Sequence, residues 1–303
     1  MRQKTPATRA WLADLILLLT ALIWGSGFVV VKQTLDALPP LWLMAYRFTM
    51  AAVVLALCCP RALRRIDRRA LWLSAPLGLV LFLAYATQTY GLQTTTPSKN
   101  AFLTALYVVL VPFLNWLLLG KRPRTTHLLA ASLAVVGIAL LSLTETLRIA
   151  GGDALSMLCG LLFALHILGI AFLQRKMDAL ALVILQFAWT AVFAWAAALV
   201  WGGTPPSPFG AHTGGLLYLG LVSGMLATTM QNLAQRYAPP SHAALLLSLE
   251  SVFGCLFSAL LWGERFTPRM LVGFALILLA VLLSELGTPK RAALPGTPEV
   301  PAA

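Results

Sequence analysis

Charged residues are scarce in this chain, and acidic residues are scarcer than basic ones. Only 11% of the 303 residues are Asp, Glu, Lys or Arg, with 10 acids against 22 bases, while 59% are hydrophobic. A soluble protein of this length could not hide so much apolar surface in its core. The composition therefore excludes an ordinary soluble protein and predicts an all-α polytopic membrane protein, with the lipid bilayer as its surroundings.

The formal net charge of +12 does not indicate a nucleic-acid-binding protein. Apart from Arg47, the Lys and Arg residues lie in short connections or at the ends of apolar runs. In a membrane protein such residues set the orientation of the spans. We therefore expect no nucleic-acid partner.

Cysteine is also sparse, and the motifs of several enzyme classes are missing. The four cysteines lie within apolar runs and form no ligand-like cluster with histidines, so neither a disulfide framework nor a metal site is expected. The sequence contains no Walker A loop, no His-Glu-x-x-His and no Gly-x-Ser-x-Gly. We expect neither an ATP-driven pump nor an enzyme, and no cofactor.

What the sequence does contain is a series of apolar segments, each close to the ~20 residues that a spanning helix needs. Proline, glycine and charged residues separate ten of them. The segments are Trp11–Val31, Pro40–Cys59, Leu71–Gln93, Pro97–Leu119, Thr126–Leu143, Ala154–Leu173, Leu180–Trp201, Gly214–Arg236, Pro240–Leu261 and Pro268–Leu286.

The distribution of basic residues predicts which side of the membrane each connection faces. With a cytoplasmic N-terminus, 16 Lys and Arg lie on the inner side and five on the outer side. Because basic residues accumulate in cytoplasmic loops, we expect both termini in the cytoplasm.

The second half of the chain repeats the first. A shift of 143 residues lays Pro97–Arg122 on Pro240–Arg265 without a gap. The pairs that carry the most weight are Pro97 with Pro240, Gly120 with Gly263, Arg122 with Arg265 and Gln88 with Gln231. We interpret these matches as an internal duplication.

Five spans per half is an odd number, so the second copy must enter the membrane from the opposite side. The predicted architecture is thus ten transmembrane helices in two inverted five-helix repeats around a central cavity. The repeats cover residues 1–147 and 148–286, and residues 287–303 form a disordered cytoplasmic tail. Inverted repeats are typical of secondary transporters that work by alternating access.

Polar residues inside the spans outline the expected cavity, because a polar side chain is costly against lipid. In the fourth span they recur at spacings of four and three, and Glu250 takes the equivalent position of Tyr107 in the ninth. The first and sixth spans pair Trp24 with His166 at an offset of 142. The expected cavity residues are Trp24, Tyr85, Gln88, Asn100, Thr104, Tyr107, His166, Gln231 and Glu250.

Each of these residues also has a structural interpretation. The two glutamines could only hydrogen-bond between helices, Trp24 and Tyr107 could only pack, and His166 could be a satisfied structural residue. Glu250 is either protonated and structural, paired, or functional, and we favour a part in substrate or proton handling. Glu250 and His166 are the candidates for proton coupling.

Other residues are assigned to helix geometry or to helix ends. We expect Arg47 to extend along its helix to the outer interface, and Glu264 and Arg265 to mark the outer end of a span. Glycine allows helices to approach closely, and proline starts or kinks them. The expected hinge or packing residues are Gly25, Gly27, Gly169, Pro97 and Pro240.

Three motifs carry a family resemblance. They are the Trp24-Gly25-Ser26-Gly27-Phe28 segment, the Pro-Ser openings at Pro97 and Pro240, and the Gly263-Glu264-Arg265 ending. Over Leu15 to Ser284 the chain resembles the EamA repeat of the drug/metabolite transporter superfamily. It departs from the family at Gly120-Lys121-Arg122, where Gly-Glu is frequent, and the cytoplasmic position of that loop accounts for the lysine.

Within the superfamily the chain is most similar to exporters of aromatic amino acids in the bacterial inner membrane. The resemblance implies a carrier, here expected as a monomer, that moves aromatic amino acids or related small metabolites outward. A multidrug or quaternary-cation exporter is the alternative, since aromatic rings and one carboxylate also suit cations. A receptor or scaffold that transports nothing is the alternative from another class.

Overall fold

The computed structural model describes residues 6–120, 122–142, 149–235, 237, 243 and 246–286, and these ranges are almost entirely helical. The predicted tail at 287–303 lies outside them. The elements are α1 (Pro6–Thr34), α2 (Pro40–Cys58), α3 (Pro60–Leu63), α4 (Arg68–Thr94), α5 (Pro97–Thr104), α6 (Tyr107–Leu119), α7 (Thr125–Ser142), α8 (Gly151–Leu173), α9 (Ala179–Trp201), α10 (Thr213–Leu217), η1 (Tyr218–Leu226), α11 (Ala227–Ala234), α13 (Glu250–Phe257), η2 (Ser258–Trp262) and α14 (Pro268–Leu286).

Seven helical stretches of the described chain are long and apolar enough to cross a membrane. One of them joins α5 and α6 (Pro97–Leu118), and another joins α10, η1 and α11 (Thr213–Ala234). Three shorter apolar stretches accompany them, at Thr125–Leu141, Leu246–Trp262 and Pro268–Ser284. The protein is therefore an all-helical, multi-pass membrane protein, and ten spans stay a prediction.

Local sequence signals account for the helix ends. Pro40, Pro60 and Pro97 occupy the first positions of their helices, where the missing N–H costs no hydrogen bond. Asp178 accepts hydrogen bonds from Leu180 N and Ala181 N at the start of α9. These caps leave few backbone groups unsatisfied where chains turn back into the bundle.

Two helices of the repeat end in the same way. Gly120 after α6 and Gly263 after η2 both have φ of 71°, the left-handed conformation that only glycine adopts without strain. These residues are 143 positions apart in the sequence. The same backbone geometry therefore ends the repeated segment in both copies.

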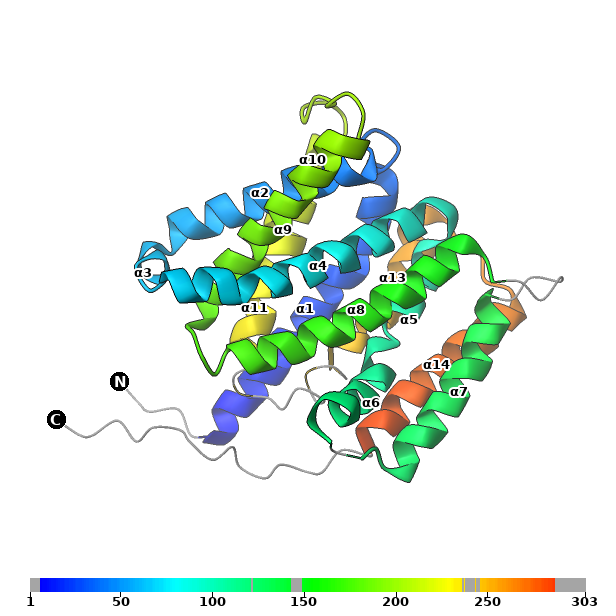
Figure 1. Ribbon diagram of the computed structural model, residues 1–303. Coiled ribbons are helices and arrows are strands. Elements are labelled where there is room, and N and C mark those ends of the chain that lie inside the picture. The colour runs from blue at the N-terminus through cyan, green and yellow to red at the C-terminus, as the bar shows by residue number, and fades with distance from the viewer. Residues whose placement is uncertain are drawn as a thin grey trace.

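The helices pack in pairs that recur between the two halves. α8 packs on α4 and α5, and in the same way α1 packs on α11 and α13. α2 packs against both α9 and η1, while α4 packs against α9. α7 and α14 form a separate pair, which Figure 1 shows running side by side at one edge of the molecule. The space enclosed by the central helices is where the polar residues gather.

Both helices that contain the repeat are interrupted close to their middle. α5 ends at Thr104, and α6 begins at Tyr107 after two turn residues. In the second copy a turn at Leu249 precedes α13, which begins at Glu250. Tyr107 and Glu250, equivalent in the repeat, are each the first residue of a new helical segment.

Candidate functional site

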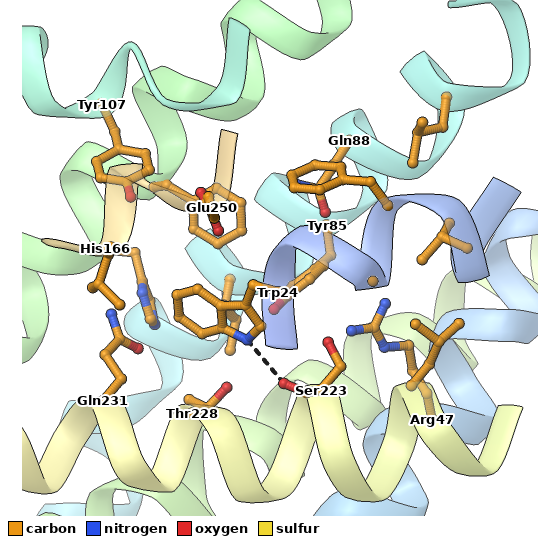
Figure 2. Close-up of a pocket in the computed structure, with 18 of the residues that line it drawn as sticks. Trp24, Arg47, Tyr85, Gln88, Tyr107, His166, Ser223, Thr228, Gln231 and Glu250 are labelled. Carbon is orange, nitrogen blue, oxygen red and sulfur yellow. Dashed lines mark hydrogen bonds between the residues drawn. The ribbon is translucent and has the colours of Figure 1, made fainter. Parts of the chain in front are cut away.

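The central helices enclose a cavity that opens at a mouth, with about 690 Å³ of space between atoms when the open mouth is counted. It lies among α1, α2, α4, α6, α8, η1, α11 and α13. Figure 2 shows that rings and polar groups share its walls. The lining residues are Trp24, Gly27, Phe28, Val31, Arg47, Leu81, Tyr85, Gln88, Leu92, Tyr107, Phe163, His166, Ile167, Leu219, Ser223, Thr228, Gln231, Leu247 and Glu250.

The structure brings seven of the nine predicted cavity residues into this lining. They come from six different elements of the chain, so no single helix makes the site. The seven are Trp24, Tyr85, Gln88, Tyr107, His166, Gln231 and Glu250.

Asn100 and Thr104 do not line the cavity, so their predicted placement is wrong. Asn100 Nδ2 donates to Ser156 Oγ at 2.7 Å and to the carbonyl of Gln88 at 3.2 Å, and the residue is fully buried. Thr104 Oγ1 contacts Cys159 Sγ at 3.7 Å. Because α8 presents small residues to α5, the two backbones approach closely and these polar groups are used between helices.

Glu250 and Tyr107 face one another across the inner part of the cavity (Figure 2). Glu250 is 5% exposed and is in neither ion pair recorded among the described residues. The hydroxyl of Tyr107 is buried, and no described residue is its hydrogen-bond partner within ordinary limits of distance and angle. The Tyr107 hydroxyl and the Glu250 carboxyl therefore interact with each other in the cavity wall, outside ordinary hydrogen-bond geometry, and the carboxyl has acceptor capacity left for a further polar group.

Trp24 is held in place by the backbone of η1. Its indole Nε1 donates to the carbonyl of Ser223 at 2.9 Å, as the dashed line in Figure 2 shows. Since the only polar atom of the ring is bonded in this way, the ring presents apolar faces to the cavity. It can serve as a stacking surface for an apolar or aromatic solute.

His166 makes a buried contact to α9. Its Nε2 lies 2.8 Å from Gln186 Oε1. The imidazole and the amide thus share one hydrogen bond between α8 and α9. The bond fixes the ring against α9, an arrangement that the structural interpretation of this histidine also predicts.

Gln88 and Gln231 add two amides to the cavity wall. Neither side chain donates to or accepts from a described residue within hydrogen-bonding distance. A pair of amides in this condition offers both donors and acceptors to a solute. The interpretation of these residues as links between helices therefore has no hydrogen bond to support it in the described ranges.

Arg47 is the largest departure from the sequence-based expectation. It does not reach the outer interface: the side chain is 2% exposed and lines the cavity from α2. Its guanidinium carbon lies 4.6 Å from the centroid of the Tyr85 ring and 5.0 Å from that of Phe48. The signal that could have identified it is the default rule that an ionisable residue inside a span is functional.

Sequence reasoning also missed Phe28, Phe163, Ser223 and Thr228, which all line the cavity. Phe163 packs edge-on against Tyr85, with ring centroids 5.3 Å apart. Single apolar or hydroxyl residues in an apolar span carry no signal of which way they point. Only the packing of the helices identifies them.

The predicted hinge and packing residues have different surroundings. A Cβ on Gly25 would meet Phe253 Cβ at 2.5 Å and the backbone of Gly254 at 2.9 Å, so glycine allows α1 and α13 to touch. Gly27 lies against Ser223 and Gly169 against the flexible side chain of Leu77. Pro97 begins α5. Pro240 lies outside the described residues.

Glu264 does more than mark a helix end. It accepts a hydrogen bond from Ser98 Oγ at 2.6 Å and another from the hydroxyl of Ser258. It thereby ties the start of α5 to the end of η2. Lys32 makes a second link between helices, from α1 to the end of α4. Its ammonium group donates hydrogen bonds to the carbonyls of Leu92 at 2.5 Å and Thr95 at 3.1 Å.

Comparison with known proteins places the chain in a family. The sequence profile of the EamA-like transporter family matches residues 11–143 and 150–286. A protein of Archaeoglobus fulgidus named "Uncharacterized transporter" is 35% identical over 90% of this chain and 86% of its own length. A second protein of that organism, with the same name, is 27% identical over 83% of this chain and 89% of its own length.

More distant similarities agree. The "Uncharacterized transporter YvbV" of Bacillus subtilis is 24% identical over 63% of both chains. A solved crystal structure superposes with a TM-score of 0.68 at 18% identity, over 90% of this chain and 97% of its own, which shows a shared fold. The described helices, the central cavity and the profile match over both halves lead to one conclusion: the chain belongs to the EamA-like transporter family.

Proposed function

We propose that this transporter exports aromatic or neutral amino acids, or related amphipathic metabolites, by alternating access. The observation that carries the proposal is the cavity wall, in which Trp24, Tyr85 and Tyr107 stand beside the amides of Gln88 and Gln231. Rings receive an apolar side chain, and the amides and the carboxylate of Glu250 receive polar groups. A small solute with both kinds of surface fits this combination.

Alternating access requires two states of similar energy, and an inverted repeat supplies them by exchanging the conformations of its halves. We propose ten spans in two repeats, residues 1–147 and 148–286. The matched interruptions at Tyr107 and Glu250 and the matched glycine ends support this division. So do the two separate stretches that resemble the family profile.

The proposed location is a bacterial inner membrane, with both termini in the cytoplasm and the protein acting as a monomer. The excess of Lys and Arg on one set of connections supports this orientation. A cysteine placed in the N-terminal segment and labelled from either side of sealed vesicles would test it. Labelling of intact right-side-out vesicles by a membrane-impermeant maleimide would contradict it.

Efflux from liposomes tests the substrate. Purified protein should accelerate the release of preloaded phenylalanine relative to liposomes without protein, and a panel of other amino acids defines the range. A pH gradient applied in either direction separates proton coupling from uniport. If no amino acid leaves faster than from empty liposomes, the substrate proposal is wrong.

The alternative is a multidrug or quaternary-cation exporter, which the aromatic rings and Glu250 would suit. The buried cation of Arg47 in the same cavity disfavours it, because like charges repel strongly in a site of low dielectric. Competition separates the two: a lipophilic dication should leave phenylalanine efflux unchanged. Strong inhibition by the dication would favour the alternative.

A further inference from the structure

Arg47 is a cation buried in the wall of the cavity. It lies inside α2 (Pro40–Cys58), is among the largest fully buried side chains of the described chain, and points into the space beneath Tyr85 in Figure 2. The faces of Tyr85 and Phe48 lie within 5.0 Å of its guanidinium carbon. Guanidinium does not lose its proton in proteins, so the charge is permanent.

Among the residues that the structure describes, no carboxylate forms an ion pair with this charge. Of the two ion pairs among the described residues, one joins Arg65 to Asp178 and the other Lys99 to Asp153. Arg47 Nε is buried with no hydrogen-bond acceptor in the described ranges. The rings offset part of the desolvation cost, but only part, because a cation–π contact is weaker than a charge-assisted hydrogen bond. The site is therefore prepared for an anionic group from outside the chain.

A carboxylate is present in the same cavity but does not reach the cation. Glu250 lines the wall from α13 and Arg47 from α2, and Figure 2 shows the two side chains apart from one another. No ion pair joins Glu250 to Arg47, whose separation therefore exceeds 4.0 Å. A guanidinium and a carboxyl group that share a cavity without touching leave a gap that a solute carrying a carboxylate and an ammonium group can bridge.

We propose that Arg47 binds the carboxylate of the transported solute and that Glu250 faces its ammonium group, so that the site selects zwitterions. The proposal rests on the proposed function and narrows its substrate class. A guanidinium holds a carboxylate through two parallel hydrogen bonds, which fixes orientation as well as charge. The apolar part of the solute then lies on Trp24 and the neighbouring rings.

Three solutes that share one ring test the assignment: phenylalanine, 3-phenylpropanoate without the amine, and phenethylamine without the carboxylate. In proteoliposomes each competes with labelled phenylalanine. On the wild type, loss of the carboxylate should weaken competition by about 10- to 100-fold, the range expected for a hydrogen-bonded charge. If phenethylamine competes as well as phenylalanine, the assignment of Arg47 is overturned without any variant.

The variant Arg47→Gln should bring the competition strengths of phenylalanine and phenethylamine to within about threefold of each other, because the charge of the guanidinium and its two hydrogen bonds to the carboxylate are both lost. Arg47→Lys keeps the charge and should retain part of the difference. Arg64→Gln is the matched control, because Arg64 is exposed beyond the end of α3 and in neither ion pair. Size-exclusion profiles and melting temperatures in detergent show whether each variant is folded.

The outcomes separate this inference from the proposed function. If amino acids are transported but Arg47→Gln keeps the wild-type preference for a carboxylate, the inference fails and the function stands. If 3-phenylpropanoate but no amino acid is moved, and Arg47→Gln abolishes that movement, the carboxylate site at Arg47 stands, while the selection of zwitterions through Glu250 and the substrate proposal both fail. A wild type that binds or moves none of the three overturns both for this class of solute.

Discussion

The two interrupted helices of the repeat, α5–α6 and α13–η2, have the same backbone plan but different surroundings. Each resumes at the repeat-equivalent residue, Tyr107 in one and Glu250 in the other, and both residues line the cavity. One turn earlier the copies diverge. Leu247 faces the cavity, whereas its counterpart Thr104 is covered by α8.

The difference lies in the neighbouring helix. α8 carries Gly160, whose missing Cβ leaves room for the carbonyls of Leu103 and Thr104 at about 3 Å from where that atom would be. In the second copy the neighbouring helix is α1, and its Gly25 packs closely against the segment that follows Glu250. The position of a small residue on the partner thus decides which side chains of a duplicated helix remain in the cavity.

The largest effect is expected from filling these two close approaches. Gly25→Ala and Gly160→Ala each place a methyl group within 3.0 Å of backbone atoms, and each should cost about 3 kcal/mol or more, the upper range for overpacking. Thermal melting in detergent and the yield of folded protein measure this. Gly214→Ala is the control, because nothing lies within 4 Å of its added Cβ. Equal melting temperatures for all three variants would contradict the packing argument.

The next effect concerns the two residues that begin the second segments. Glu250→Gln should lower the efflux rate by about tenfold or more, because the carboxyl group that faces the ammonium group of the solute is lost. Tyr107→Phe removes a hydroxyl that faces Glu250 without a hydrogen bond of ordinary geometry and leaves the carboxyl in place, so it should change the rate less than threefold. Efflux from proteoliposomes measures both. A larger effect for Tyr107→Phe would reverse the assignment of roles.

A smaller effect is expected where Glu264 ties the two copies together. Glu264→Gln weakens its bonds from Ser98 and Ser258 and should cost about 1.5 kcal/mol of stability. Ser98→Ala removes one of these bonds and should cost less. Melting temperatures of the single and double variants report the coupling between the residues. Strictly additive losses would mean that Ser98 and Glu264 do not stabilise each other.

The smallest effect on transport is expected from Asn100→Ala. The side chain bonds to Ser156 and to the Gln88 carbonyl outside the cavity, so stability should fall by about 1 kcal/mol while the concentration for half-maximal transport stays the same. The melting temperature and the substrate dependence of efflux measure the two quantities. A change in substrate preference at unchanged stability would return Asn100 to the binding site.

The sequence predicted the cavity residues best where the repeat aligned two polar positions. Tyr107 with Glu250 and Gln88 with Gln231 were found in this way, and each pair does line the cavity. The prediction was wrong where a neighbouring helix decides which way a side chain points, because α8 covers Asn100 and Thr104. Arg47 was misread because its depth in the span is visible in sequence, while the direction of a flexible side chain is not.

η1 is a π-helix, and its wide turns determine which residues of the following helix line the cavity. Leu219, Ser223, Thr228 and Gln231 all line the cavity at spacings of four, five and three. A step of five turns an α-helix about 140° away from its starting face. In η1, where Ala227 N reaches back five residues to Val222 O, the turns are wider, and the same step ends only a little beyond one full turn. A helical wheel drawn straight through this span would put Thr228 and Gln231 on the wrong face, because the backbone changes its angular step between them and Leu219.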